Sequence, residues 1–316
     1  MKQSVCNREL KSLQHTLPAV LEGYIDNIRS RYGVHLNFHD LCGISRISQE
    51  LEKVLAPYLY HNNSFCNAVK KTDSGFKQCI ESKSRLCRFC GTRQNSFYGR
   101  CSLGAEEFVF PVFWRGKLLA LICAGPFVSE EGRTLKRIAK SAEMLGVDAE
   151  KLVERYLGIA RKIDFPLRDF FYDMGLLIQL LAQIYFSFAY EARCKSGGSL
   201  NEGQLLENHK SIYIIDRAVL FIKENYSRDL TLADIAANCY CNASYLSRHF
   251  KEKLGLGIVE YIHQIRVEAA KEILDITVKP VTEVGMMVGY NDSGYFSKVF
   301  KQYTSWSPSE YRKRKT

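Results

Sequence analysis

The chain has 316 residues, and its content of 46% hydrophobic and 25% charged residues is that of an ordinary soluble globular protein, which excludes a disordered or fibrous chain. The length predicts about two domains of ~150 residues each. The formal net charge of +10 favours a polyanionic partner, but residues 210–316 carry 16 basic and 12 acidic side chains, so the excess is not confined to one end.

Three features of the chain bear on its compartment. No apolar core follows the first eight residues, so we expect no secretory signal. The most apolar run, residues 176–189, is interrupted by Gln179 and Gln183 and is shorter than the ~20 residues of a bilayer span. We therefore expect a cytoplasmic protein with no membrane partner, in which the eleven cysteines form no disulfide framework.

The N-terminal part predicts a helix, a strand and a second helix. Residues 8–31 have a helical stripe of apolar side chains, which Pro18 can break in two. Residues 33–43 alternate Val34, Leu36 and Phe38 with polar residues, as a half-buried strand does. Residues 47–60 return to helical spacing.

A hairpin and three helices follow. Residues 107–113 and 117–125 predict two strands, and Arg115-Gly116 between them is a natural turn. Residues 133–145, 148–163 and 167–193 are helical by period. Apolar side chains nearly encircle the last of these helices, which favours packing against this domain and against a second copy of the chain. Residues 1–194 therefore predict an α+β domain of the PAS/GAF kind, with an antiparallel sheet that holds a pocket.

Aromatic side chains around the hairpin are candidates for the wall of a pocket that binds a small organic effector. They could equally form the core of a small sheet, because alternation lets only half of residues 108–113 face one side. The candidates are Phe65, Phe97, Tyr98, Phe108, Phe110, Phe113, Trp114 and Phe127.

Five of the cysteines crowd into one segment, and they are Cys66, Cys79, Cys87, Cys90 and Cys101. Cys87 and Cys90 form one CxxC pair, which with other members of the group could hold zinc or another soft metal. A strong zinc signal requires two such pairs. The alternatives are a reactive thiol and ordinary, partly buried thiols in a loop-rich domain.

This middle segment resembles the PocR-type sensory domain. The resemblance rests on Phe65-Cys66, on Gly75 with Cys79, on YGRCSLG at 98–104 and on AGP at 124–126. It implies a domain that senses small organic molecules and is often fused to AraC-type DNA-binding units. Ser102 stands where the family commonly has His, and the Cys87–Cys90 pair is an addition to the pattern.

The last part of the chain repeats one pattern. Residues 195–210 begin with KSGGSLNEG and predict a linker, and residues 211–316 predict a second domain whose first helix covers 213–226. TLADIA at 231–236 precedes SYLSRHFK at 244–251, and VTEVG at 281–285 precedes YFSKVFK at 295–301. Each copy predicts a helix-turn-helix unit. Gly289 supplies the second turn, whereas the first has Tyr240 there, so we expect that turn to be made another way.

A helix over residues 258–274 joins the two units, with Ile258, Ile262, Ile265, Ala269 and Ile273 on one apolar face. It should hold the second helices of the units about one DNA turn, ~34 Å, apart. Two units in register, this joining helix and SPSEYR at 307–312 resemble the DNA-binding domain of AraC/XylS-type transcription regulators, over roughly the last third of the chain.

In the second helix of each unit, Leu246, Phe250, Phe296 and Phe300 should face the core. The DNA-contact candidates on the opposite faces are Ser244, Ser247, Arg248, Lys251, Ser293, Gly294, Ser297, Lys298 and Lys301. The resemblance implies base reading by all except Lys251 and Lys301, which fit phosphate contacts. Arg248 can form two hydrogen bonds with guanine, worth ~1–3 kcal/mol. The alternatives are a solvated helix face and, for residues 312–315, either a phosphate contact or a frayed terminus.

Together these features predict a bacterial transcription regulator of the AraC/XylS type that is not an enzyme. Its expected partners are double-stranded promoter DNA, a small effector, a second copy of the chain and RNA polymerase. One alternative keeps DNA binding but senses a metal or an oxidant through the cysteines. Another is an enzyme whose reactive cysteine accepts a methyl group or transfers electrons. The chain lacks a phosphate-binding Gly loop, and His35, His39 and His61 are scattered along it, which disfavours catalysis.

Overall fold

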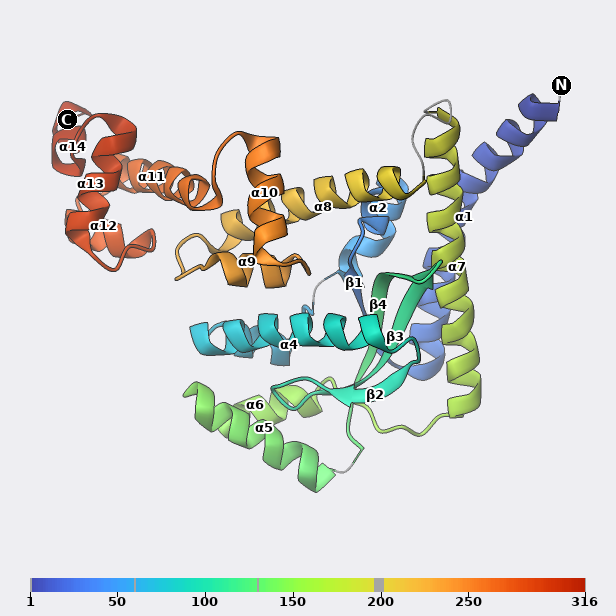
Figure 1. Cartoon of the computed structure of the whole chain (residues 1–316). Coiled ribbons are helices and arrows are strands. Elements are labelled where there is room, and N and C mark those ends of the chain that lie inside the picture. The colour runs from blue at the N-terminus through green and yellow to red at the C-terminus, as the bar shows by residue number, and fades with distance from the viewer. Residues whose placement is uncertain (1, 60, 130, 196–201, 316) are drawn as a thin grey trace. The chain divides into compact units, whose positions relative to one another are not determined.

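The structure is a computed structural model that describes residues 2–59, 61–129, 131–195 and 202–315 (Figure 1). Side chains are described from residue 16 onward, apart from those of residues 60, 130, 189–209, 315 and 316. The chain forms two compact units, Met1–Tyr213 and Ile214–Thr316. Residues 196–201 of the predicted linker lie outside the described residues, whereas 202–210 form the start of helix α8 (Glu202–Asn225).

The first unit is built on a four-stranded antiparallel sheet with the order β1-β4-β3-β2. The strands are β1 (His35–Asp40), β2 (Phe97–Arg100), β3 (Glu106–Trp114) and β4 (Lys117–Phe127). This confirms the predicted α+β fold. Arg115 and Gly116 make the predicted hairpin turn, with φ angles of 45° and 75°. The sequence did not predict β2, because four residues that include Gly99 show too little alternation.

One face of the sheet packs against two long helices, α1 (Lys2–Tyr32) and α7 (Leu167–Lys195) (Figure 1). Their apolar side chains form one core with those of β1, β3 and β4. α1 continues through Pro18 without a break. Pro18 is itself buried, and the residues after it pack on this core from Leu21 onward, which offsets the lost backbone hydrogen bond.

β1 is more buried than the predicted half-buried strand, because five of its six residues are buried. Leu36 and Phe38 face the core, as predicted. The Asp40 carboxylate is covered because it accepts hydrogen bonds of 2.7 to 3.1 Å from the backbone N–H groups of residues 42–45. Asp40 is therefore buried together with its hydrogen-bond donors, a feature that alternation alone does not reveal.

Short helices follow β1, namely η1 (Ile44–Arg46), α2 (Gln49–Leu55) and η2 (Ala56–Tyr58). The predicted helix over residues 47–60 is therefore shorter and divided. Ser48 begins α2 by accepting a hydrogen bond from the backbone N–H of Leu51 at 3.1 Å. Pro57 lies in the first turn of η2, where the missing N–H costs little.

On the other side of the sheet lie α3 (Ser64–Lys70), α4 (Asp73–Thr92), α5 (Glu131–Leu145) and α6 (Ala149–Leu157). The cysteine-rich segment is therefore mainly helical, and the loop-rich prediction is wrong. A second core here includes the buried Phe65, Ile138 and Tyr156. The predicted helix over 148–163 ends at Leu157, because the backbone of Arg161 exchanges hydrogen bonds with Pro126 and Val128 at the end of β4.

Among the described residues, one segment, Leu167–Phe188 of α7, has the length and hydropathy of a membrane span. This is weak evidence for a span, because the segment places Phe170, Met174 and Leu181 in the core against the sheet. The opposite side of the helix is exposed within one chain, with Tyr172 67% exposed. Of the two predicted contacts of this helix, the one with its own domain is therefore present, and the side predicted to meet a second copy is exposed.

The second unit is all-α, as predicted, and Figure 1 shows it as a series of helices (orange to red). After α8 come α9 (Leu232–Asn238), α10 (Ala243–Leu254), α11 (Ile258–Ile276), α12 (Val281–Met287), α13 (Ser293–Thr304) and α14 (Pro308–Lys315). The pairs α9–α10 and α12–α13 are the two predicted helix-turn-helix units. Leu246, Phe250, Phe296 and Phe300 have no exposed surface, which confirms the predicted apolar faces.

Both turns between the paired helices pass through a left-handed residue. Gly289 has a φ angle of 96°, and Tyr240 has one of 55°. The expectation that the first turn is made another way is therefore wrong. Tyr240 adopts a conformation that costs a non-glycine residue energy, and the Arg217 guanidinium lies over its ring, 4.5 Å from the centroid.

The joining helix α11 buries different faces along its length. Ile258 and Ile262 are buried, as predicted, but Ile265, Ala269 and Ile273 are only half-buried. The C-terminal half instead buries Val267, Ala270 and Leu274 in the core of the second pair. The predicted stripe is confirmed in part, since Ala269 and Ile273 pack at the edge of this core. The fully buried face differs because the helix packs against a different neighbour at each end.

Candidate functional site

The second helices of the two pairs begin in the same way. Asn242 caps α10 and Asp292 caps α13, and their side chains accept hydrogen bonds from the backbone N–H of Tyr245 at 2.7 Å and of Tyr295 at 2.5 Å. Each cap fixes the start of its helix, so the polar residues of the first turns project from equivalent positions.

Eight of the nine predicted DNA-contacting residues are exposed. They are Ser244, Ser247, Arg248, Lys251, Ser293, Gly294, Lys298 and Lys301. The ninth, Ser297, is half-buried, and its hydroxyl donates a hydrogen bond to the Ser293 carbonyl at 2.9 Å. The residues on α10 also line a shallow surface depression. Two exposed polar helix faces backed by apolar ones are what a major-groove reader requires.

Two side chains whose contacts the sequence did not reveal, His263 and Arg312, stabilise this unit. His263 of α11 lies 3.0 Å from the Tyr290 hydroxyl through Nδ1 and 3.3 Å from the Tyr295 hydroxyl through Nε2, which ties the start of α13 to the joining helix. In α14, Arg312 donates a hydrogen bond to the Lys279 carbonyl at 2.6 Å. The described part of the predicted C-terminal tail is therefore attached to its domain.

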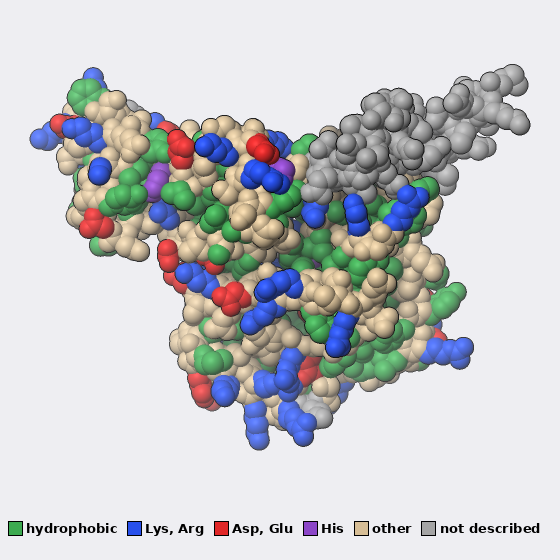
Figure 2. Space-filling view, viewed as in Figure 1, with side chains coloured by type: hydrophobic (Ala, Val, Ile, Leu, Met, Phe, Trp, Pro, Cys, Tyr) green, Lys and Arg blue, Asp and Glu red, His purple; other side chains and the backbone are tan. Residues whose placement is uncertain are grey.

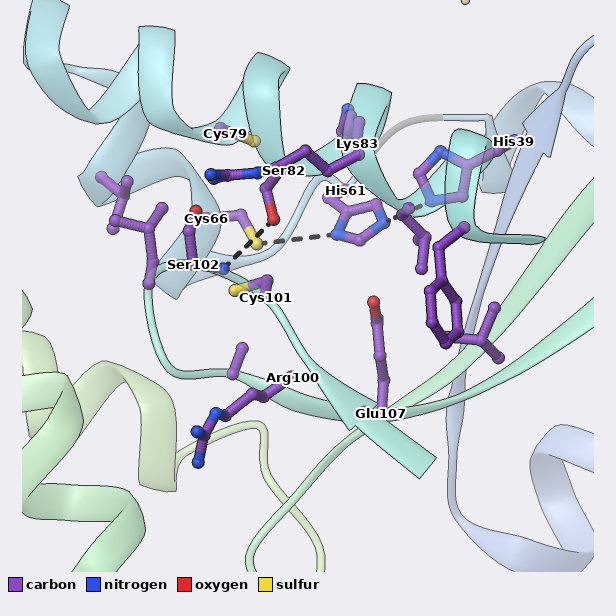
Figure 3. A pocket seen from close by; sticks show the side chains of 18 of the residues that line it. His39, His61, Cys66, Cys79, Ser82, Lys83, Arg100, Cys101, Ser102 and Glu107 are labelled. Atoms are coloured by element: carbon purple, nitrogen blue, oxygen red, sulfur yellow. Dashed lines mark hydrogen bonds between the residues drawn. The ribbon is translucent and has the colours of Figure 1, made fainter. Parts of the chain in front are cut away.

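The first unit contains a cavity of about 620 Å³ between the sheet and helices α3 and α4 (Figure 3). Of the predicted pocket aromatics, Phe65, Phe97 and Tyr98 line it. Phe108, Phe110, Trp114 and Phe127 do not, because they belong to the core on the α1–α7 face of the sheet. Phe113 is also absent from its lining. Strand alternation divides the aromatic residues between the two faces.

The predicted cysteine cluster is also divided. Cys66, Cys79 and Cys101 line the cavity, whereas Cys87 and Cys90 do not. Burial raises the pKa of the Cys66 and Cys90 thiols to about 11, so both are protonated at neutral pH. Within the described part of the chain, no three His, Cys, Asp or Glu side chains are placed to hold a metal ion. Since Cys87 and Cys90 lie on the helix α4, they have no metal-binding loop around them.

Two of the histidines that are scattered in the sequence meet at the cavity wall (Figure 3). The Nε2 atoms of His39 and His61 are 3.1 Å apart, so one ring donates and the other accepts. His61 Nδ1 lies 3.9 Å from Cys66 Sγ. Burial holds the pKa of His61 well below its usual value, so this ring is neutral at pH 7.

β3 begins with two glutamates in opposite environments, at a shift in the β3–β4 register. Glu106 is buried, pairs with Arg137, and accepts hydrogen bonds from Ser129 Oγ at 2.6 Å, Tyr98 OH at 2.8 Å and Thr134 Oγ1 at 3.0 Å. Burial alone would raise the pKa of Glu106, but the hydrogen bonds, led by that of Ser129, lower it below its usual range. Glu106 is therefore an ionised structural residue.

Glu107 points into the cavity (Figure 3). Burial raises the pKa of its carboxyl to about 7, against a hydrogen bond from the Cys123 thiol and the charge of Lys83, which both lower it. Near neutral pH the group is therefore about half protonated and can either donate or accept a hydrogen bond.

The charges around the cavity are predominantly positive. Lys83, Arg85 and Arg100 line it, and Glu107 is the one acidic residue in its described lining. In the view of Figure 2, the surface of the first unit below α4 shows more basic than acidic side chains. Sequence reasoning missed both Lys83 and Glu107. The sequence feature that could have indicated Glu107 is the pair of adjacent acids, Glu106 and Glu107, at the start of an apolar strand.

Two family models match the chain. Residues 29–166 match the sensory domain found in PocR, and residues 235–314 match a helix-turn-helix domain. The chain joins a PocR-type sensory domain to an AraC-type helix-turn-helix domain. The PocR-type domain contains the whole cavity, and the AraC-type domain contains both capped helices.

Several curated proteins are similar to part of this chain. An uncharacterized HTH-type transcriptional regulator from Pseudoalteromonas carrageenovora is 34% identical over 32% of this chain and 59% of its own length. The bifunctional transcriptional activator/DNA repair enzyme AdaA of Bacillus subtilis is 35% identical over 31% of this chain and 46% of its own. The raffinose operon regulatory protein RafR of Pediococcus pentosaceus is 38% identical over 33% of this chain and 38% of its own. The chain thus spans less than two thirds of each relative.

Among solved structures, the C-terminal domain of AraT, a response regulator from Geobacillus stearothermophilus, is similar to this chain. It is 37% identical over 32% of this chain and 84% of that chain, with a TM-score of 0.32.

Proposed function

We propose that this protein is a bacterial transcription regulator whose AraC-type domain binds double-stranded promoter DNA under the control of a small organic effector in the PocR-type domain. The observation that carries this proposal is the pair of capped helices, α10 and α13, each with an exposed polar face opposite a fully buried apolar one. The family matches to both domains and the names of the relatives as transcriptional regulators support it.

On DNA, the two helices enter successive major grooves on one face of the duplex, about 34 Å apart. Arg248 reads a guanine, Lys298 and the serines contact neighbouring bases, and Lys251 and Lys301 contact phosphates. One copy of the domain then covers two short blocks of sequence. RNA polymerase is a further proposed partner, since a regulator bound at a promoter acts on it.

The effector occupies the cavity of the PocR-type domain. Its volume of about 620 Å³ lies within the ~300–1,000 Å³ typical of small-molecule sites. The cavity combines apolar side chains with a few polar groups, as such sites do. Binding there changes how α3 and α4 pack on the sheet, and this change alters DNA binding.

Homodimer formation in the cytoplasm is part of the proposal. The exposed side of α7 carries Tyr172 at 67% and Leu176 at 37% exposure, and a second copy would bury these side chains. Sedimentation equilibrium tests this assembly. Tyr172→Glu should shift the protein toward monomer, and an unchanged mass would contradict the proposed dimer face.

No catalytic activity is proposed. A cysteine nucleophile acts as a thiolate, whereas burial raises the pKa of Cys66 to about 11 and that of Cys101 still further, which leaves both protonated. The DNA-repair activity in the name of AdaA belongs to a relative that matches 31% of this chain.

The experiment that tests DNA binding is selection of sites from a random duplex library with the full-length protein. We expect an enriched motif of two blocks separated by about one helical turn. Arg248→Ala and Lys298→Ala should each relax one block, while Lys271→Ala, on the joining helix, should leave the motif unchanged. Failure to enrich any motif, or equal effects of all three variants, would contradict the proposal.

A further inference from the structure

The described lining of the cavity in the PocR-type domain contains one acidic and three basic side chains. Lys83 is half-buried on α4, and the more exposed Arg85 and Arg100 also line the space. Glu107 projects from β3, on the sheet side of the cavity (Figure 3). The charge of Lys83 acts on the Glu107 carboxyl and lowers its pKa, against the larger effect of burial. With Glu107 half protonated, the lining carries a net positive charge.

The other groups that act on Glu107 are uncharged. The Cys123 thiol on β4 donates a hydrogen bond to its carboxyl, and burial raises the pKa of this thiol. Cys66 on α3 and Cys101 after β2 are protonated for the same reason. His61 at the wall is neutral because burial lowers its pKa. No fixed negative charge in the described lining therefore balances Lys83.

The rest of the cavity is suited to an apolar body. Phe65, Phe97 and Val109 supply apolar walls, and the volume of about 620 Å³ accommodates a ring with a short polar substituent. Lys83, Glu107 and His61 supply polar groups in the same lining, so a ligand with a polar group on an apolar body can use both kinds of side chain.

We propose that the effector is a small organic carboxylate, held by the Lys83 ammonium and by the protonated carboxyl of Glu107, with its apolar part against Phe65 and Phe97. Both protein groups donate hydrogen bonds to the ligand oxygens. The proposal rests on the proposed effector-sensing function and adds the chemical class of the ligand. A second negative charge beside Glu107 favours its protonated form, so the protein takes up a proton when the ligand binds near neutral pH.

The charge of the cavity separates this ligand class from two others. An ammonium ligand would be attracted by ionised Glu107 but repelled by Lys83, Arg85 and Arg100. An uncharged ligand would leave the half-buried Lys83 without a counter-charge. A carboxylate satisfies Lys83 and also uses the proton that burial already favours on Glu107.

The test uses the full-length protein and three probes of similar shape and different charge: benzoate, benzamide and benzylamine. Calorimetric titration and thermal unfolding would be measured at pH 6, 7 and 8. We expect benzoate to raise Tm and to bind about tenfold more tightly than benzamide, and benzylamine not to bind. If either of these two binds as tightly as benzoate, or if millimolar benzoate does not bind, the proposal is wrong.

Proton uptake supplies a second readout. Because binding requires protonated Glu107, the affinity for benzoate should fall about tenfold between pH 6 and pH 8. Glu107→Gln keeps a donor, so it should bind benzoate without this pH dependence. Lys83→Met should weaken binding about tenfold, whereas Lys77→Met, on the same helix but outside the cavity lining, should not. Retained pH dependence in Glu107→Gln, or unchanged affinity in Lys83→Met, would overturn the proposal.

The proposal of a carboxylate ligand and the proposal of effector control can be contradicted by different experimental results. Benzoate that binds in the cavity without changing the affinity for the selected DNA would contradict effector control but not the carboxylate site. Benzamide or benzylamine that binds there and changes DNA affinity would support effector control and contradict the carboxylate.

Discussion

The two domains direct their polar chemistry in opposite directions. In the AraC-type domain, Arg248 and Lys251 project from α10 into solvent, opposite the buried Leu246 and Phe250. In the PocR-type domain, Glu107 projects into a cavity. Outward charges stay solvated and cost little, whereas an inward charge requires a partner or changes its protonation state. The contrast shows why burial changes the protonation of Glu107, whereas the DNA-contact candidates on α10 stay in contact with solvent.

Glu106 and Glu107 show both responses to burial on adjacent residues. Glu106 has Arg137 and three hydroxyl donors, so it stays ionised. Glu107 has one thiol donor and a cation that acts from farther away, so its pKa rises to about 7. The number of hydrogen-bond donors and cations around each carboxyl therefore decides which of the two glutamates is structural and which is available to a ligand.

The largest predicted effect comes from removing the partner of the ionised acid. Arg137→Met should lower the free energy of unfolding by about 3 kcal/mol, at the low end of the range for a broken buried pair, because Arg137 is 32% exposed. Urea denaturation measures this loss. The control is Lys136→Met, an exposed neighbour on α5. Equal losses in the two variants would show that hydroxyl donors alone hold Glu106 ionised.

A smaller effect, of opposite sign, is expected at the cavity. The pKa of Glu107 rises from its ordinary 4.5 to about 7 on folding, so the folded state binds more protons, and stability falls as pH rises through this interval. Glu107→Gln removes this loss. Its advantage in unfolding free energy should be small at pH 4.5 and reach roughly 2 kcal/mol at pH 8, less than the ~3 kcal/mol of the full pKa change, because solvent screens the partly exposed carboxyl. A constant difference across this range would mean that Glu107 does not titrate there.

On the outward-facing side, Arg248→Ala should weaken binding to the selected DNA about tenfold, or 1.4 kcal/mol, and relax preference at one base pair. Folding should be unaffected, since the side chain is exposed. Fluorescence anisotropy with matched and single-mismatch duplexes measures both effects. A loss that is equal on matched and mismatched DNA would assign Arg248 to a phosphate.

The smallest effect is expected for Lys251→Ala. A phosphate contact contributes little sequence information, so affinity should fall by less than about 1 kcal/mol on all duplexes. The slope of log affinity against log salt should decrease by about 1. An unchanged slope would remove Lys251 from the interface.

Much of the AraC-type domain was predictable because its signals are local. The repeated helix pairs and the burial of Leu246, Phe250, Phe296 and Phe300 follow from helical period. Prediction failed where two contacts compete, as in α11, whose buried face changes between its two ends. It also failed at Tyr240, which adopts the left-handed conformation under the Arg217 guanidinium.

In the PocR-type domain, residue patterns were enough to predict the hairpin, the antiparallel sheet and three of the cavity aromatics. Folding alone decided the rest. The cavity gathers His39, His61, Lys83, Cys101 and Glu107 from separate segments. The face on which each strand residue lies depends on pairing register, and the pKa of Glu107 depends on how many donors reach it. Periodicity reports which side of an element is apolar, but which polar side chains meet inside is a property of the assembled fold.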